Sequence, residues 1–119
     1  MMTFARRTYF LLLTLAATPA LAQSHDMPMH DQQSGASHDM MASMDKMNSG
    51  MAAAPMTGDP DRDFVSMMIP HHQGAVDMAE TELRYGKDAV IRHLAREIIA
   101  AQKKEIAFMR HWQVTHAAH

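Results

Sequence analysis

Two stretches of helical periodicity, separated by a break of three residues, constrain the fold of this chain most. Asp59 is suited to cap the first stretch, and a proline follows it at the first helical position. Gly86 is a residue typical of a helix C-terminus, and Asp88 can cap a second helix. The sequence therefore predicts an all-α fold: a helical hairpin of two antiparallel helices, at about 60–85 and 89–114.

This short hairpin cannot cover its own apolar surface. The apolar arc of the first helix spans more than half of its circumference, and one partner helix covers less than that. We therefore expect a homodimer, in which two hairpins complete a four-helix bundle about a two-fold axis.

The first 22 residues have the pattern of an export signal. Arg6 and Arg7 precede an apolar run at 9–17, and small residues lead up to Ala22. This order of charged, apolar and small residues predicts a Sec-type signal peptide, cleaved after Ala22, and a periplasmic location. Because no second long apolar run follows, we expect no stable membrane insertion after cleavage.

The next segment, residues 23–58, contains Met but no Val, Ile, Leu, Phe, Tyr or Trp. Such a segment buries too little surface to offset the entropy of ordering it, which predicts disorder. The choice of Met over every other large apolar residue indicates a role for sulfur. We therefore interpret 23–58 as a disordered, metal-binding leader before a helical copper-binding domain at 59–119.

The whole chain has 14 methionines, nine histidines and no cysteine. Thioether sulfur is a soft donor that binds Cu(I) and Ag(I), and it does not form disulfides in an oxidising compartment. The formal net charge of −2 gives no indication of nucleic-acid binding. The composition favours an exported protein that binds soft metal ions.

The leader repeats the tetrapeptide SHDM at 24–27 and 37–40, and methionines at helical spacing follow, so that this piece could fold around an ion. Its candidate ligands are His25, Met27, Met29, His30, His38, Met40, Met41, Met44 and Met47. Cleavage after Ala22 would also leave a histidine at the third position. A free amine, two amide nitrogens and this imidazole would suit Cu(II).

The segment MMIPHHQGAVDM, at 67–78, brings imidazoles and thioethers into the predicted hairpin. At 100° per residue, His71 lies in one stripe with Met67 and Met78, whereas His72 lies on the neighbouring edge, with Met68 between the two histidines. These five residues, together with Met109 of the second helix, are the candidate metal ligands of the domain.

The second helix carries two polar residues, Gln102 and Glu105, in its apolar stripe. If facing residues have numbers that sum to about 173, Gln102 lies level with His71 and Glu105 with Met68. Both could accept the second N–H of a metal-bound imidazole. The alternative is a core histidine that one of them satisfies, packed among core methionines.

The motifs MIPHHQGAVDMA and AREIIAAQKKEIAFMRHW resemble the CopM-type copper metallochaperones, a family of exported helical-bundle proteins. The resemblance covers 59–112, and the matching residues are Met68, Ile69, His71, His72, Ala75, Met78, Gln102, Glu105, Met109 and Trp112. It implies copper and silver binding through Met and His, and a role in copper tolerance. Longer members carry the two-helix unit twice, whereas this chain carries it once.

The expected function is a copper-binding metallochaperone or buffer that exchanges copper with an exporting or receiving periplasmic protein. We expect no enzymatic activity, because the inward-facing Glu-x-x-His pairs of a di-iron bundle are absent and no nucleophile stands with a base. Two alternatives stay open: a helical interaction module that needs no metal, and a protein that binds Ni(II) or Zn(II).

Overall fold

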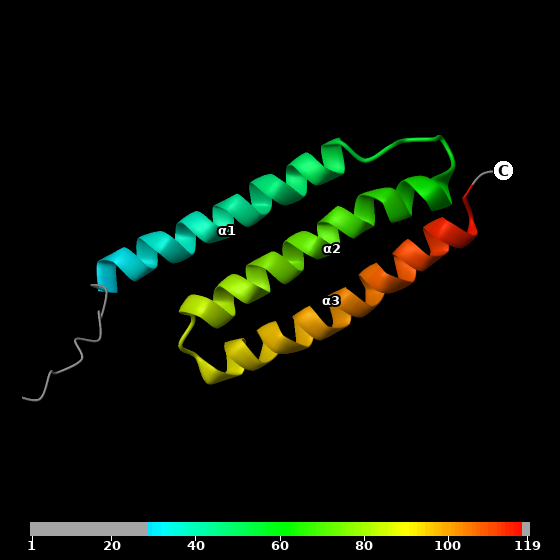
Figure 1. Cartoon of the computed structure of the whole chain (residues 1–119). Helices are drawn as coiled ribbons and strands as arrows, with labels where there is room; N and C mark the ends of the chain where they lie inside the picture. Colours follow the sequence, from blue (N-terminus) through cyan, green and yellow to red (C-terminus); the bar gives the residue numbers. More distant parts are fainter. Residues whose placement is uncertain (1–28, 118–119) are drawn as a thin grey trace, which may run out of the picture.

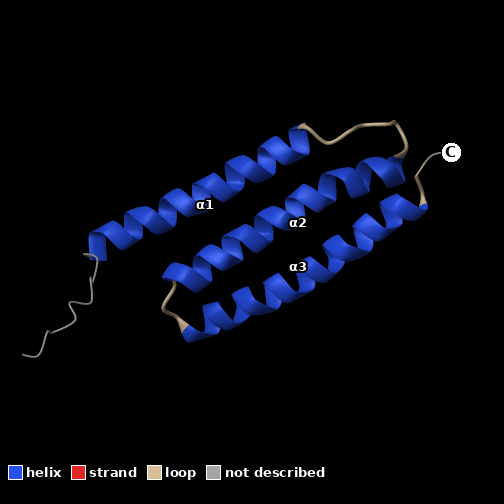
Figure 2. Cartoon of the chain, viewed as in Figure 1, coloured by secondary structure: helices blue, strands red, loops and turns tan. Residues whose placement is uncertain are grey.

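The computed structural model describes residues 29–117, which form three helices joined by short loops (Figure 1). They are α1, Met29–Ala52, α2, Pro60–Tyr85, and α3, Ala89–Thr115. This part of the chain contains no strand (Figure 2), so the predicted all-α class and the predicted hairpin are confirmed. None of these three helices is long and apolar enough to cross a membrane.

Side-chain caps set the beginnings of both hairpin helices, as predicted. The Asp59 carboxylate accepts hydrogen bonds from the backbone N–H groups of Asp61 and Arg62, at 3.0 and 3.4 Å. Asp88 does the same for the first N–H groups of α3, at 2.9 and 3.0 Å. Each cap satisfies donors that the helix itself cannot pair.

The three helices lie side by side in one layer, with α2 in the middle (Figure 1). Within the described residues α1 contacts α2, and α2 contacts α3, but α1 and α3 do not contact each other. The layer is therefore open, and both of its broad faces expose parts of α2.

The hydrophobic core lies between α2 and α3. Val65 and Val76 of α2 are buried against Ile106 and Met109 of α3, and Val76 is only 1% exposed. Four partly buried side chains surround this cluster: Met68, Ile69, Ile99 and Trp112. No side chain of α1 belongs to the cluster, so the hairpin contains the main apolar stabilisation of the described structure.

The predicted disorder of 23–58 is wrong for residues 29–52, which form α1; residues 23–28 lie outside the described range. Close backbone approach explains how a helix with so few large side chains docks. A Cβ atom built on Gly74 would lie 2.7 Å from Met47 Cβ, and one on Gly50 would lie 2.8 Å from Pro70 Cβ. The two glycines therefore let α1 approach α2 closely.

Ion pairs also hold α1 against α2. Lys46 Nζ donates to Asp77 Oδ2 at 2.9 Å, and Arg84 Nη1 donates to Asp39 Oδ2 at 2.6 Å. The Tyr85 hydroxyl donates to the same Asp39 oxygen at 3.2 Å. Docking of α1 thus depends on ion pairs and small residues rather than on a continuous hydrophobic interface.

The contact with α1 alters the reason for expecting a second copy. That expectation rested on an apolar arc of α2 that α3 alone leaves uncovered. Because α1 covers one flank of α2 from within the same chain, only the two broad faces of the layer are left for another molecule. The four-helix bundle of two hairpins stays a prediction.

Candidate metal centre

His72 is the one imidazole that α2 turns into its interface with α3. It is 9% exposed, and its Nε2 atom lies 2.6 Å from Glu105 Oε2. Helical side chains lean toward the N-terminus of their own helix, so residues of two antiparallel helices meet about one turn off level. Uniform helical rise predicted that Glu105 lies level with Met68. The lean of both side chains explains why Glu105 contacts His72, one turn further along α2, instead.

The contact with Glu105 determines which ring nitrogen of a neutral His72 carries the proton. A carboxylate only accepts hydrogen bonds, so the N–H must be on Nε2 and Nδ1 keeps a lone pair. Nδ1 is buried and has no hydrogen-bond partner among the described residues. A buried acceptor without a partner is costly in a core, whereas a metal-bound imidazole has this arrangement.

Two thioethers lie one helical turn from this pair of residues. Met68 precedes His72 by one turn on α2, and Met109 follows Glu105 by one turn on α3. Met109 is 6% exposed and belongs to the core cluster, against which Met68 packs. His72, Met68 and Met109, which we call the His72 group, thus share one section of the hairpin interface.

The donor set of the His72 group limits the metals that fit it. Among residues 29–117 no three His, Cys, Asp or Glu side chains lie together in a way that could hold a metal ion. The donors that the His72 group offers are one imidazole and two thioethers. Such a mixed donor set fits soft Cu(I) or Ag(I) better than Zn(II) or Ni(II).

The other predicted stripe does not enter the hairpin core. His71 is exposed, Met67 is 37% exposed and Met78 is half-buried. The rings of His71 and His72 lie 6.0 Å apart but are tilted by 58°, because adjacent helical residues point in different directions. Gln102, the predicted partner of His71, is half-buried, and its side chain makes no hydrogen bond within the described part of the chain.

The predicted leader ligands are distributed over α1. Met40 shares an apolar groove with Met78, and Met47 packs against Gly74. The remaining described members, His38, Met41 and Met44, are exposed. Met29 and His30 belong to the first turn of α1, where side chains are not described, and His25 and Met27 lie outside the described residues.

A family model matches residues 12–113, which is most of the chain, and its description is a domain of unknown function, DUF305. The chain belongs to the DUF305 family. No curated protein matches it. The family match covers the helical region but assigns no activity, metal or partner to it.

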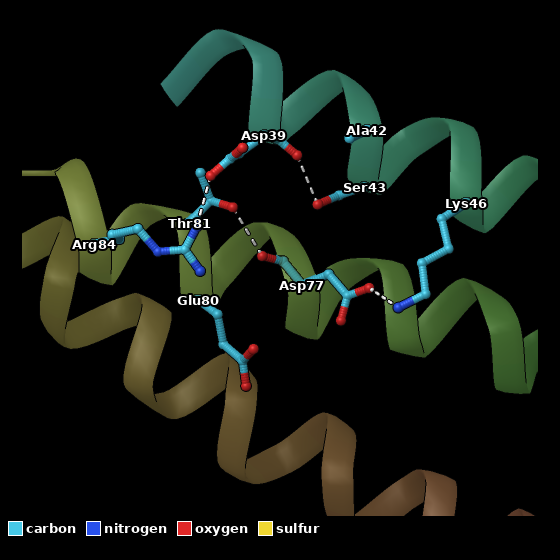
Figure 3. A pocket seen from close by; sticks show the side chains of 8 residues that line it. All are labelled: Asp39, Ala42, Ser43, Lys46, Asp77, Glu80, Thr81 and Arg84. Atoms are coloured by element: carbon cyan, nitrogen blue, oxygen red, sulfur yellow. Dashed lines mark hydrogen bonds and ion pairs between the residues drawn. The ribbon is translucent and has the colours of Figure 1, made fainter. Parts of the chain in front are cut away.

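This DUF305 domain also has a polar cavity of about 260 Å³ between α1 and α2 (Figure 3). Sequence reasoning missed it because it treated α1 as disordered. The hydroxyls of Ser43 and Thr81 are buried here, and each donates to the carbonyl oxygen four residues earlier in its own helix. Lys46 and Asp77 pair with each other, so these polar groups satisfy one another and serve to dock α1.

The carboxylates at this seam are held in their charged form. Burial raises the pKa of Asp77, but the hydrogen bonds from Lys46 and Gln73 and the Lys46 charge outweigh it and lower the pKa. The pKa of Asp39 is lowered as well, by its hydrogen bond with His38 and by Tyr85 and Arg84. The pKa of Lys46 is raised by Asp77.

We expect acid to release α1 before it unfolds the hairpin. A carboxyl group whose folded pKa is lowered stabilises the fold above its ordinary pKa of about 4, and this stabilisation is lost as pH falls through the lowered pKa. Far-UV circular dichroism should therefore lose helix signal below about pH 4, before Trp112 fluorescence in α3 changes. In Asp77→Asn the seam should already be loose at neutral pH. Coincident transitions of both signals would contradict this order.

Proposed function

We propose that this protein is a periplasmic binding protein for Cu(I), and also Ag(I), that acts as a metallochaperone or buffer in copper tolerance. The observation that supports this most is the buried His72 imidazole, whose Nε2 contacts Glu105 and whose Nδ1 has no partner, one helical turn from Met68 in the same interface as Met109. The resemblance to CopM-type metallochaperones supports the same reading. Copper is the cargo of this protein rather than a resident cofactor.

Each member of the His72 group has a separate part in the proposal. His72 Nδ1 donates its lone pair to the ion, and the thioethers of Met68 and Met109 supply soft donors. Glu105 orients the imidazole by accepting the Nε2–H and makes Nδ1 more electron-rich. Because the Glu105 side chain is 58% exposed, it also connects the buried imidazole with solvent.

Sites outside the hairpin complete the proposal. The methionines of α1 offer further soft donors on the surface, where Met41 and Met44 are 59% and 40% exposed. The N-terminus that follows Ala22 offers nitrogen donors to Cu(II). Exposed donors can exchange an ion with an exporting or receiving periplasmic protein faster than the buried His72 can.

Two other metal functions fit the described residues less well. Zn(II) and Ni(II) sites draw on imidazole and carboxylate ligands, and no cluster of three such groups is present between residues 29 and 117. A metal-independent interaction module would need no unpaired imidazole nitrogen in its core.

Competitive Cu(I) titration of two matched triple variants tests the proposal. Met68→Leu/His72→Gln/Met109→Leu removes the His72 group, and Met67→Leu/His71→Gln/Met78→Leu makes the same three changes in the exposed stripe. We expect the first variant to lose one tight Cu(I) equivalent and the second to keep it, with near-wild-type helicity in both. If the second variant loses the tight equivalent and the first keeps it, the exposed stripe is the site and our assignment is wrong.

The predicted homodimer stays part of the proposal, in a changed form. Two bare hairpins no longer describe the association, because α1 occupies one flank of α2. Each copy instead contributes a layer of three helices.

A further inference from the structure

One broad face of the three-helix layer is apolar. A groove of about 330 Å³ crosses it, and all three helices line this groove. Its apolar lining includes Met40 of α1, Ala75 and Met78 of α2, and Ile91, Leu94 and Ile98 of α3. Ile91 and Leu94 are each 47% exposed although they are large and apolar. We call this surface the methionine face.

The opposite face of the layer is polar. Lys46–Asp77 and Arg84–Asp39 bridge α1 to α2 there, and Lys103–Glu80 bridges α3 to α2 at 3.3 Å. Figure 3 shows the α1 and α2 members of this set side by side at one seam. The charged side chains of this second face are well solvated. Of the two broad faces, only the methionine face is an apolar surface without a partner.

The methionine face is large enough to hold a stable partner. Helices of 26 and 27 residues are about 40 Å long at 1.5 Å per residue. Three helices spaced by about 9 Å then present roughly 1,000 Å² on one side. A stable interface buries about 800 Å² on each partner, so most of this face must take part.

We propose that the methionine face binds a second copy of this chain, layer against layer, about a two-fold axis. Two-fold contacts pair each surface with itself, so a suitable face must carry little charge. Glu82 is the one charged residue that lines the groove. Flexible methionine side chains adapt their shape to one another, which favours a match between two identical faces.

In this assembly the exposed stripe of α2 lies in the interface between the two copies. The middle of α2 lies between His71 and Ala75, so a two-fold axis that runs between the two layers and crosses the middle of α2 passes beside them. Met67, His71 and Met78 of one copy then face the same residues of the other. The inference concerns assembly alone, and it holds or fails whether or not the His72 group binds copper.

Sedimentation velocity of the purified, metal-free chain over the micromolar range tests the proposal. Ile91→Lys/Leu94→Lys places charge on the methionine face, at positions exposed enough in one copy to tolerate it. Ala100→Lys/Val114→Lys is the control, because these exposed residues lie on the opposite side of the same helix. We expect wild type and control to sediment as dimers, and the double variant to sediment at half the mass with unchanged helicity.

Two results would overturn the proposal. One is a dimer that persists in Ile91→Lys/Leu94→Lys. The other is a wild-type monomer at every concentration, whether the face is left open or is covered by residues 1–22 of the same chain. Comparing the full chain with a protein that begins at Gln23 tells these two forms of monomer apart.

Discussion

Replacing Gly74 with leucine should detach α1 and leave the α2–α3 hairpin folded. A Cβ atom on Gly74 would already lie 2.7 to 2.8 Å from the Cβ, Cγ and Sδ atoms of Met47. Since Met47 Cβ is fixed to the α1 backbone, the helix itself must move away. Leucine is a better helix former than glycine, so α2 gains stability while its contact with α1 is lost.

The free α1 should then unfold, because an isolated helix without a packed face is marginal in water. α1 contains 24 residues against 26 and 27 in α2 and α3, so helix signal should fall by about a third. Limited proteolysis should cleave after Lys46, which in the wild type lies in a folded helix and is paired with Asp77 of α2.

Ala75→Leu is the matched control for this experiment. It adds the same side chain at the next position, which faces the groove of the methionine face rather than α1. We expect it to keep the full helix signal and resistance at Lys46. Retention of both in Gly74→Leu would show that α1 does not depend on the close approach at this glycine.

The hairpin could be predicted because its determinants are local. Asp59 and Asp88 cap the helices through groups two and three residues away, and apolar periodicity identifies the face that packs. The same periodicity put both His71 and His72 on the apolar side, but only His72 is buried. Counting residues set Glu105 level with Met68, one turn from its observed partner His72, since it ignores the lean of helical side chains.

The docking of α1 could not be predicted in the same way. A disorder argument counts apolar surface, and α1 has little besides methionine. Its attachment depends on pairs of residues far apart in sequence, such as Lys46 with Asp77 and Gly50 with Pro70. The glycines and charges were visible, but nothing local shows which residues they meet.

The unpaired Nδ1 atom also required coordinates. The sequence places a histidine on an apolar face with two polar residues opposite, and a fully satisfied core histidine would give the same pattern. The structure shows one nitrogen paired and the other buried without a partner. A free, buried nitrogen is what the copper proposal requires, and a fully satisfied core histidine would lack it.

The unpaired nitrogen leads to a prediction with two opposite signs: His72→Leu should stabilise the metal-free protein and abolish its stabilisation by Ag(I). In the metal-free wild type, Nδ1 is a buried acceptor without a partner, which costs about 1–3 kcal/mol. Leucine removes that cost, and the freed Glu105 carboxylate, 58% exposed in its side chain, returns to water. The variant should therefore melt at a higher temperature than wild type without metal.

Ag(I) should reverse this order. An ion that binds only the folded state adds about 4 kcal/mol at a free concentration 1,000 times its Kd. For a domain of this size that raises Tm by roughly 15–30 °C. His72→Leu has lost the imidazole donor, so its Tm should hardly move. Thermal melts with and without Ag(I) measure both effects, and His71→Leu, the same change at the neighbouring position, should keep the stabilisation by Ag(I). A metal-free His72→Leu protein that melts well below wild type would mean that the Glu105 contact outweighs the unpaired nitrogen. His72 would then be a core residue, held for stability rather than for an ion.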